Sequence, residues 1–273
     1  MKSRILTALV LFPPVIYLIG WSPYWLFLAA VLATAERSLY EYFLICRNAG
    51  VKSFPALGYA GAACVCLAQT AALFLPVNPT LAVLGLFLLL SLSLGLRWTV
   101  DLEDYLQAVS STIFGILYVG FTLSCLMPLR FSDPVRGQKL IFLLFLVIWA
   151  GDICAFFVGR SLGRHLLFPR VSPKKTVEGA VGGLAGSLLI AWAFAHWFWQ
   201  TGDLKTVILL AALIAMAGQA GDFAESAMKR GAGMKDSAAI LPGHGGLLDR
   251  IDAVLFGVPT LWLALLIKDS WPL

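Results

Sequence analysis

Long apolar segments joined by short polar connections cover most of the chain, and this pattern predicts membrane-spanning helices. A spanning helix needs roughly 20 consecutive, mostly apolar residues. By that rule the sequence predicts an all-α polytopic membrane protein with about nine transmembrane helices. The predicted spans are residues 5–20, 22–36, 56–75, 80–96, 106–127, 139–158, 177–199, 204–220 and 250–267.

Polar residues are distributed unevenly between the predicted spans. Glu36, Arg37 and Glu41 continue the helical pattern of the second span, so we expect that helix to extend beyond the membrane. The stretch from Gly218 to Asp252 is a polar island between apolar segments. We therefore divide one integral membrane unit into N-terminal transmembrane helices, 1–140, and C-terminal helices that carry the polar loops, 141–273.

Composition supports a membrane protein. Of 273 residues, 60% are hydrophobic and only 13% are charged, with a mean hydropathy of +0.86, whereas a soluble domain carries about a quarter charged residues. The net charge of +5 is better explained by basic cytoplasmic loops than by nucleic-acid binding. The five cysteines lie mostly in apolar segments and are read as buried hydrophobes. The first apolar segment has no clear cleavage site and is expected to be a retained helix.

The distribution of Lys and Arg predicts the orientation. With the N-terminus in the cytoplasm, the outer side holds only five of the twenty basic residues, and the inner side holds fifteen. This bias favours a cytoplasmic N-terminus and an outer C-terminus, and it places both polar C-terminal loops, with any active site, on the cytoplasmic side. The five outer residues are Arg130, Arg136, Lys139, Lys205 and Lys268.

Carboxylates gather at the edges of the C-terminal spans. Asp249 and Asp252 are three residues apart and would share one face of a helix, and Asp222 and Glu225 have the same spacing. Carboxylates near the hydrocarbon are costly unless they have partners. A bound divalent metal such as Mg²⁺ would provide one. Ion pairs with Lys229, Arg230 or Arg250 would provide another, and the residues alone leave both explanations open.

Glycines and basic residues beside these carboxylates suit phosphate groups. HGGLLDR places two glycines and a histidine before a predicted helix start, where free N–H groups and the helix dipole favour anions. Lys229, Lys235 and Arg250 add positive charge on the same side of the membrane, as do Lys174 and Lys175 of SPKKT. His244 is equally suited to a general base and to a structural hydrogen bond.

SPKKTVEGAVGG also has a local structural logic. Ser172 or Thr176 can cap the following helix, and Glu178 would lie in its first turn, where a negative charge is stabilised. The glycines that follow would let this helix pack closely against a neighbour. They stand at positions 179, 182, 183 and 186.

Together these residues indicate an integral membrane enzyme that acts on a nucleotide and a lipid, without a G-x-x-x-x-G-K-[ST] loop. The stretch from Ser226 to Asp252 resembles the signature of the phosphatidate cytidylyltransferases, or CDP-diacylglycerol synthases: S-x-x-K-R-x4-K-D-x-x-x-x-[LIF]-P-G-H-G-G-x-x-D-R-x-D. Every fixed position of that signature is present here. The resemblance extends to GDICAFFVGRSLGRH, to SPKKTVEG and to the GD-x-x-ES before the signature, and so covers about residues 150–255.

The resemblance implies that CTP and phosphatidate react to give CDP-diacylglycerol and pyrophosphate, by attack of the lipid phosphate on the α-phosphorus of CTP. It implies a helical membrane protein that forms homodimers, uses Mg²⁺ with a K⁺-like second metal, and resides in a bacterial-type plasma membrane. The implied metal ligands are Asp222, Asp249 and Asp252, which with Lys229 and Arg250 form the catalytic set. The implied substrate-binding set is Lys174, Lys175, Glu178, Ser226, Arg230, Lys235, Asp236, His244, Gly245 and Gly246.

Two alternatives remain from the sequence. A CTP-dependent polyprenol kinase would transfer the γ-phosphate and would need a base to activate the alcohol, and the complete signature argues against it. A non-enzymatic membrane transporter would be favoured by inverted repeats, and none is evident in the sequence.

Overall fold

The computed structural model describes residues 13–99, 101–200, 203–238 and 245–270. Within these residues the regular structure is helical, apart from isolated bridge residues such as the antiparallel pair Leu166 and Thr176. Six of the helical segments described are long and apolar enough to cross a membrane. The predicted all-α membrane fold is therefore confirmed at this level.

Backbone contacts divide the chain into two compact units. The first unit combines the chain up to Pro134 with Met228–Arg250, and the second combines Val135–Ala227 with Ile251–Leu273. Each unit is described by itself below. The polar island, residues 218–252, is therefore divided between the units: its central part belongs to the first unit and both of its ends belong to the second.

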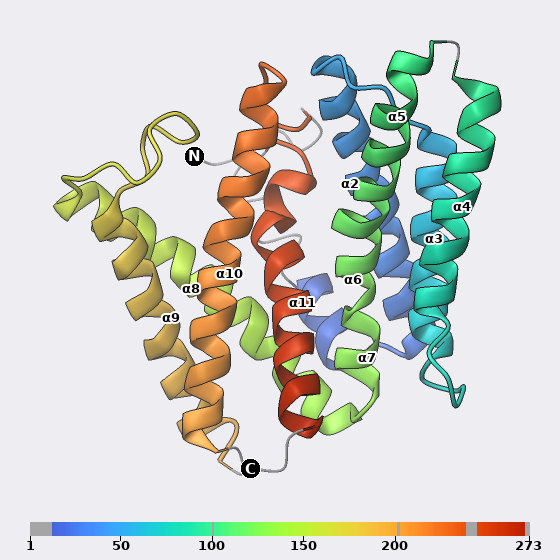
Figure 1. The fold of residues 1–273 in the computed structure, drawn as a ribbon. Helices are drawn as coiled ribbons and strands as arrows, with labels where there is room; N and C mark the ends of the chain where they lie inside the picture. Colours follow the sequence, from blue (N-terminus) through green and yellow to red (C-terminus); the bar gives the residue numbers. More distant parts are fainter. Residues whose placement is uncertain (1–12, 100, 201–202, 239–244, 271–273) are drawn as a thin grey trace. The chain divides into compact units, whose positions relative to one another are not determined.

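The first unit is built around α3, which contacts α2, α4, α5 and the π-helical segment η1 (Figure 1). Leu57 and Val65 of α3, with Phe87 and Ile116, form a buried apolar core between these helices. The elements are α2 (Tyr24–Asn48), α3 (Pro55–Ala71), α4 (Thr80–Trp98), α5 (Leu102–Gly115), η1 (Ile116–Phe121), α6 (Thr122–Ser124) and α7 (Leu126–Phe131).

The predicted span 106–127 is an interrupted helix rather than a regular one. Between α5 and α6 the backbone forms the π-helical turn η1, where Gly120 lies directly against the backbone and Cβ of Ala62 in α3. A side chain at position 120 would collide with α3. Hydropathy does not encode such a change of helical pitch, so the sequence pattern predicted the segment but not its break.

The second unit contains α8 (Pro134–Leu162), α9 (Val177–Trp197), most of α10 (Leu204–Gly231) and most of α11 (Leu248–Ser270). The glycines of α9 lie against α8, as the sequence predicts. Gly179 and Gly183 approach backbone atoms of Ala155, Gly159 and Gly151, while Gly182 packs on Val158 and Gly186 on Cys154. Close packing of α8 on α9 therefore depends on small residues.

The helices agree with most predicted spans, but six long apolar helices are fewer than the nine spans predicted. The helix after residue 22 continues past Glu41 to Asn48, as expected. Its neighbour α3 has 17 residues, and neither helix belongs to the six. Half of the predicted span 5–20 lies outside the described residues, and residues 13–20 are helical. The nine-span topology therefore stays a prediction.

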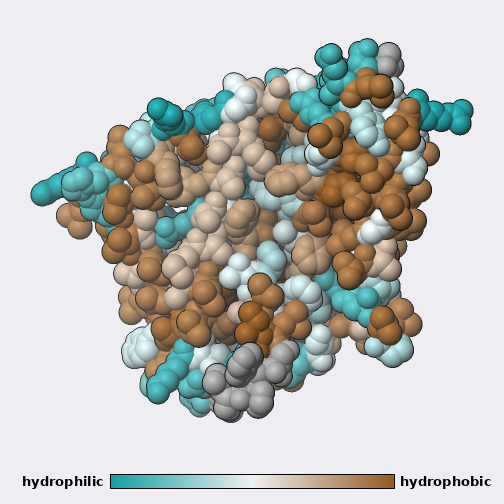
Figure 2. Space-filling view, in the orientation of Figure 1, coloured by the Kyte–Doolittle hydropathy of each residue, from teal (hydrophilic) through white to brown (hydrophobic). Residues whose placement is uncertain are grey.

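Each unit presents large apolar side chains on its surface. In the first unit Leu81 and Leu96 of α4 are 81% and 64% exposed, and in the second Leu189 of α9 is 66% exposed. Figure 2 shows hydrophobic surface over both helices. Extended apolar surfaces of this kind fit contact with lipid acyl chains.

Candidate active site

In the second unit, Lys175 and Asp222 form an ion pair. Asp222 lies in α10, and its other carboxylate oxygen accepts a 3.4 Å hydrogen bond from the hydroxyl of Ser226, one turn later. The Lys175 ammonium also lies 4.6 Å from the centre of the Phe223 ring. The structure therefore brings together three residues that the sequence places in the site: Lys175, Asp222 and Ser226.

This ion pair lines a cavity of about 680 Å³ in the second unit. The cavity has both apolar walls and charged groups, because Phe156 and Leu167 line it together with Lys174 and Asp152. A pocket of this size and mixed character suits an amphipathic or phosphorylated ligand. Its remaining lining residues are Ala155, Gly159, Arg160, Ser172, Lys175, Thr176, Gly179, Ala180, Gln219, Asp222 and Phe223.

The connection before α9 is held rigidly, which fixes the position of Lys175. Thr176 is the N-cap of α9, and its hydroxyl accepts a 3.1 Å hydrogen bond from the amide of Gly179. The amide of Leu167 donates to the carbonyl of Lys175 at 3.0 Å. Of the two residues predicted as a cap, Thr176 is thus the one observed.

Glu178 lies in the first turn of α9, as predicted, and it holds the preceding connection. Its carboxylate accepts hydrogen bonds from the amides of Arg164 and His165, at 3.0 and 3.2 Å, and lies 2.6 Å from Nδ1 of His165. These contacts of Glu178 stabilise the connection before α9, a structural role beside the substrate-binding role predicted for it. His165, which stands outside the predicted site, is its side-chain partner.

Asp252 also belongs to the second unit, where α10 and α11 approach each other closely. A Cβ at Gly221 would collide with the carbonyl oxygen of Asp252 and lie 3.0 Å from Phe256. Only glycine permits the two helices to come this close. The turn of α10 that carries Asp222 therefore faces the turn of α11 that carries Asp252.

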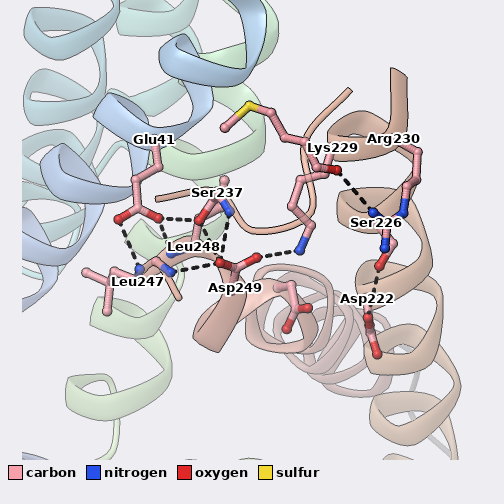
Figure 3. Close-up of polar contacts among 12 residues, drawn as sticks. Glu41, Asp222, Ser226, Lys229, Arg230, Ser237, Leu247, Leu248 and Asp249 are labelled. Atoms are coloured by element: carbon pink, nitrogen blue, oxygen red, sulfur yellow. Dashed lines mark hydrogen bonds and ion pairs between the residues drawn. The ribbon is translucent and has the colours of Figure 1, made fainter. Parts of the chain in front are cut away.

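In the first unit, Asp249 is the centre of a buried polar cluster (Figure 3). Its Oδ1 pairs with the ammonium of Lys229, and the two side chains are only 7% and 10% exposed. Its Oδ2 accepts hydrogen bonds from the amides of Gly246 at 2.8 Å and Ser237 at 2.9 Å. Since one oxygen is matched by a charge and the other by backbone donors, the carboxylate is held in one orientation.

Two members of this cluster are absent from the predicted site. The hydroxyl of Ser237 lies 3.0 Å from Oδ2 of Asp249 and 2.6 Å from the carboxylate of Glu41, which belongs to α2. Ser237 follows the fixed Asp236 of the signature, so its place in the sequence was a usable signal. Glu41 lies 196 residues before Ser237, and no local pattern connects the two.

The other predicted site residues are more exposed or lie outside the described chain. Lys235, Asp236 and Arg250 are exposed, and exposed Arg230 donates to the carbonyl of Met234 at 3.2 Å. Gly245 has a φ of +76°, a backbone conformation that glycine adopts without strain. His244 lies outside the described residues.

The residues fit a hard divalent cation in their donor chemistry, but the described part of the chain holds no group of three or more His, Cys, Asp or Glu side chains arranged as a ligand set. Mg²⁺ is commonly bound through one or two carboxylates together with substrate phosphates. Asp222 and Asp252 lie on helix turns that the contact at Gly221 brings together, so this part of the site offers two carboxylates of the kind that Mg²⁺ prefers. Asp249 and Asp222 each have a lysine partner, as the ion-pair explanation anticipates for Asp249 with Lys229.

Comparison with known sequences places the chain among its relatives. The profile of the Cytidylyltransferase family matches residues 2–268. The chain belongs to this family. The match includes both the N-terminal helices and the polar island, so the family extends beyond the signature stretch.

Phosphatidate cytidylyltransferases from several bacteria are similar to this family member. That of Staphylococcus saprophyticus is 40% identical over 154 residues, which are 56% of this chain and 58% of the relative. That of Bacillus subtilis is 36% identical over 185 residues, or 68% and 67% of the two chains. That of Brucella suis is 44% identical over 153 residues, or 55% and 54%. The matches thus span between about half and two thirds of these relatives.

Proposed function

We propose that this protein is a phosphatidate cytidylyltransferase of phospholipid biosynthesis, which converts CTP and phosphatidate to CDP-diacylglycerol and pyrophosphate. Membership of the Cytidylyltransferase family and the similarity to bacterial phosphatidate cytidylyltransferases support this proposal. The structural observation that carries it is the cavity of about 680 Å³, where Lys174, Lys175 and Asp222 stand beside apolar walls. Such a cavity suits a substrate with a phosphate head and a hydrocarbon body.

The proposed reaction is a displacement at phosphorus. An oxygen of the lipid phosphate forms a bond to the α-phosphorus of CTP, and the bond from that phosphorus to the oxygen bridging the α- and β-phosphates breaks. That oxygen leaves with pyrophosphate and carries the negative charge. Phosphatidate is already anionic near neutral pH, so no side chain has to remove a proton from it. The protein therefore has to orient the two phosphates and neutralise their charge.

The basic residues divide naturally between the two phosphate groups. Lys175, fixed by its backbone hydrogen bond and by the capped helix that follows, would bind the lipid phosphate together with Lys174. Lys229, Lys235 and Arg250 would bind the triphosphate, with Arg230, Ser226 and the backbone of Gly245 and Gly246 supporting them. In this proposal Lys175 and Lys229 exchange a carboxylate for a phosphate, or share it, when substrate binds.

Asp222, Asp249 and Asp252 would hold Mg²⁺, and the family resemblance implies a K⁺-like second metal beside it. When bound, divalent metal neutralises charge on the attacking and leaving oxygens. The contribution of the chain is to present carboxylates whose positions are set in advance. For Asp249 the backbone donors provide this, and for Asp222 and Asp252 the contact at Gly221 does.

We further propose that the nine predicted spans place the N-terminus and the active site on the cytoplasmic side of a bacterial plasma membrane. The excess of basic residues in the predicted inner loops supports this orientation. A homodimer is also expected from the resemblance to the phosphatidate cytidylyltransferases. The bilayer would supply phosphatidate, and CTP would come from the cytoplasm.

Acceptor specificity tests the proposed function. Purified protein in detergent with Mg²⁺ and CTP should release pyrophosphate when phosphatidate is added. Diacylglycerol, which has the same hydrocarbon body without the phosphate nucleophile, should give none. Pyrophosphate release that does not depend on the lipid phosphate would refute the cytidylyltransferase proposal.

A polyprenol provides a third arm of the same experiment. If phosphate transfer to the polyprenol occurs while phosphatidate is inert, the protein is a CTP-dependent lipid kinase instead. Both acceptors combine a polar head with a hydrocarbon body, so this arm addresses the alternative that is closest in chemistry.

A further inference from the structure

Glu41 is a carboxylate of α2 buried completely within the first unit. Burying a charge costs several kcal/mol unless hydrogen bonds and opposite charges compensate. Here the guanidinium of Arg37, one turn earlier, lies 3.5 Å away. The remaining partners come from the polar island, about 200 residues later in the chain. A buried carboxylate with this desolvation cost calls for a role.

The partners of Glu41 define that role (Figure 3). Its two oxygens accept hydrogen bonds from the amides of Leu247 at 3.0 Å and Leu248 at 2.8 Å. These amides stand at the start of α11, where N–H groups have no partner within the helix. Glu41 therefore caps α11 from another helix, with its negative charge at the positive end of the helix dipole.

The next residue of α11 is Asp249, and a second connection to it runs through Ser237. The Ser237 hydroxyl is 2.6 Å from Glu41 and 3.0 Å from Asp249, and it has one proton to donate. The shorter contact assigns that proton to Glu41. Asp249 then keeps the amide donors of Ser237 and Gly246 and the Lys229 ammonium.

There is no room at this junction for another side chain. A Cβ at Gly246 would collide with both the Ser237 hydroxyl and the Glu41 carboxylate. Glu41 is therefore packed directly against the backbone turn that donates to Asp249, and a displacement of its carboxylate moves that turn.

We propose that Glu41 is a positioning residue of the active site, which fixes the start of α11 and thereby the carboxylate of Asp249. Its role as a positioner for catalysis rests on the proposed function, while its role in fixing α11 does not. Groups that orient ligating carboxylates through hydrogen bonds commonly change metal affinity or activity about 10–100-fold when removed.

The first test is independent of activity and uses the full-length protein in detergent. Glu41→Gln keeps the size of the side chain but replaces one acceptor oxygen by an NH₂ donor facing amide donors. We expect faster hydrogen–deuterium exchange at residues 245–253 in this variant. Glu36→Gln, a matched change on the same helix, should leave that exchange unchanged. Glu36 is a suitable control because its Oε1 is buried and accepts no hydrogen bond among the described residues. Unchanged exchange in Glu41→Gln would overturn the proposal.

The second test separates positioning from simple loss of stability. In Glu41→Gln, kcat should fall about 10-fold or more, and the Mg²⁺ concentration for half-maximal activity should rise by about the same factor. KM for phosphatidate should change little, and Glu41→Asp, which retains the charge, should recover part of kcat. A lowered Tm with normal kcat and normal Mg²⁺ dependence in the folded fraction would assign Glu41 a structural role only and overturn the positioning claim.

The shared hydroxyl gives an internal check. Ser237→Ala combined with Glu41→Gln should cost less in kcat than the product of the two single effects, because both act through the same contact. If the two replacements instead reduce kcat by independent factors that multiply, Glu41 does not act on Asp249 through Ser237. If the wild-type protein makes no CDP-diacylglycerol, the proposed function fails, and the exchange experiment still decides whether Glu41 fixes α11.

Discussion

At the scale of single residues, the carboxylates predicted as catalytic differ in their surroundings. The side chain of Asp249 is nearly buried, and its Oδ2 accepts hydrogen bonds from two backbone amides. By contrast, the paired side chains of Asp222 and Lys175 are each about one third exposed. The exposed pair contributes little to stability, since such ion pairs are commonly worth about 0–1 kcal/mol. Lys175 is therefore better explained by ligand binding than by folding.

Replacement of Lys175 tests this explanation. Lys175→Ala should raise KM for one substrate about 10-fold or more, because a charge-assisted phosphate contact is lost, while Tm changes by only a few degrees. Steady-state kinetics with each substrate varied in turn would measure the effect. Lys205→Ala removes an exposed lysine that does not line the cavity, so it is the matched control and should leave both KM values unchanged. Unchanged KM values in Lys175→Ala would contradict the assignment.

Replacement of Asp249 tests the carboxylate itself. Asp249→Asn should reduce kcat by about 10²-fold or more, because the neutral amide neither binds a divalent cation well nor offsets the charge of Lys229. Circular dichroism and size-exclusion chromatography should still show folded protein. Near-normal turnover in this variant would contradict a catalytic carboxylate at position 249.

The sequence was informative about these residues individually and much less so about their partners. The family resemblance placed Asp249, Lys229 and Asp222 in the site. Asp249 pairs with Lys229, which the residues alone left open as an alternative to metal binding, whereas Asp222 pairs with Lys175, a partner that the sequence did not indicate. Glu41 could not be predicted as a member, because its contacts join positions about 200 residues apart. A carboxylate in the continuation of an apolar helix was its only local signal.

At the scale of helices, apolar periodicity predicted where the segments lie, and capping residues predicted where α9 begins. Thr176 and the small residues of α9 behave as expected, because their effects are local or depend only on close packing. The π-helical turn η1 was not predicted, since it reflects the fit of Gly120 against Ala62 of another helix. Helix positions can therefore be predicted from the sequence, whereas distortions that depend on packing against another helix cannot.

Gly221 supports a prediction at this scale. In Gly221→Ala the new methyl group would meet the carbonyl of Asp252 in α11, so α10 and α11 must separate. We expect kcat to fall about 10-fold or more, because a small displacement of reacting groups already costs that much. Gly231→Ala near the end of the same helix is a matched control, since its Cβ would meet nothing within 4 Å. Equal activity of both variants and wild type would show that the close approach is unimportant for catalysis.

At the scale of the whole molecule, the apolar helices agree with a membrane protein, and the charge distribution predicts its orientation. Six helical segments among the described residues have the length and hydropathy to cross a bilayer. The predicted count of nine also includes α2, α3 and a first span of which half lies outside the described residues.

Accessibility of engineered cysteines measures the orientation. In right-side-out vesicles, Lys205→Cys should react with a membrane-impermeant maleimide, and Arg170→Cys should react only after permeabilisation. Both positions are exposed in the structure, and the five native cysteines provide the background in unmodified protein. The reverse labelling pattern would contradict an active site that faces the cytoplasm.

The central claim concerns which phosphorus of CTP is transferred, and one labelling experiment tests it. Purified protein in detergent is given Mg²⁺, phosphatidate and CTP labelled at either the α- or the γ-phosphorus. Our account predicts that the α label enters the lipid product and that the γ label is released in pyrophosphate. Entry of the γ label into the lipid, with no incorporation from the α position, would contradict cytidylyl transfer and identify a kinase.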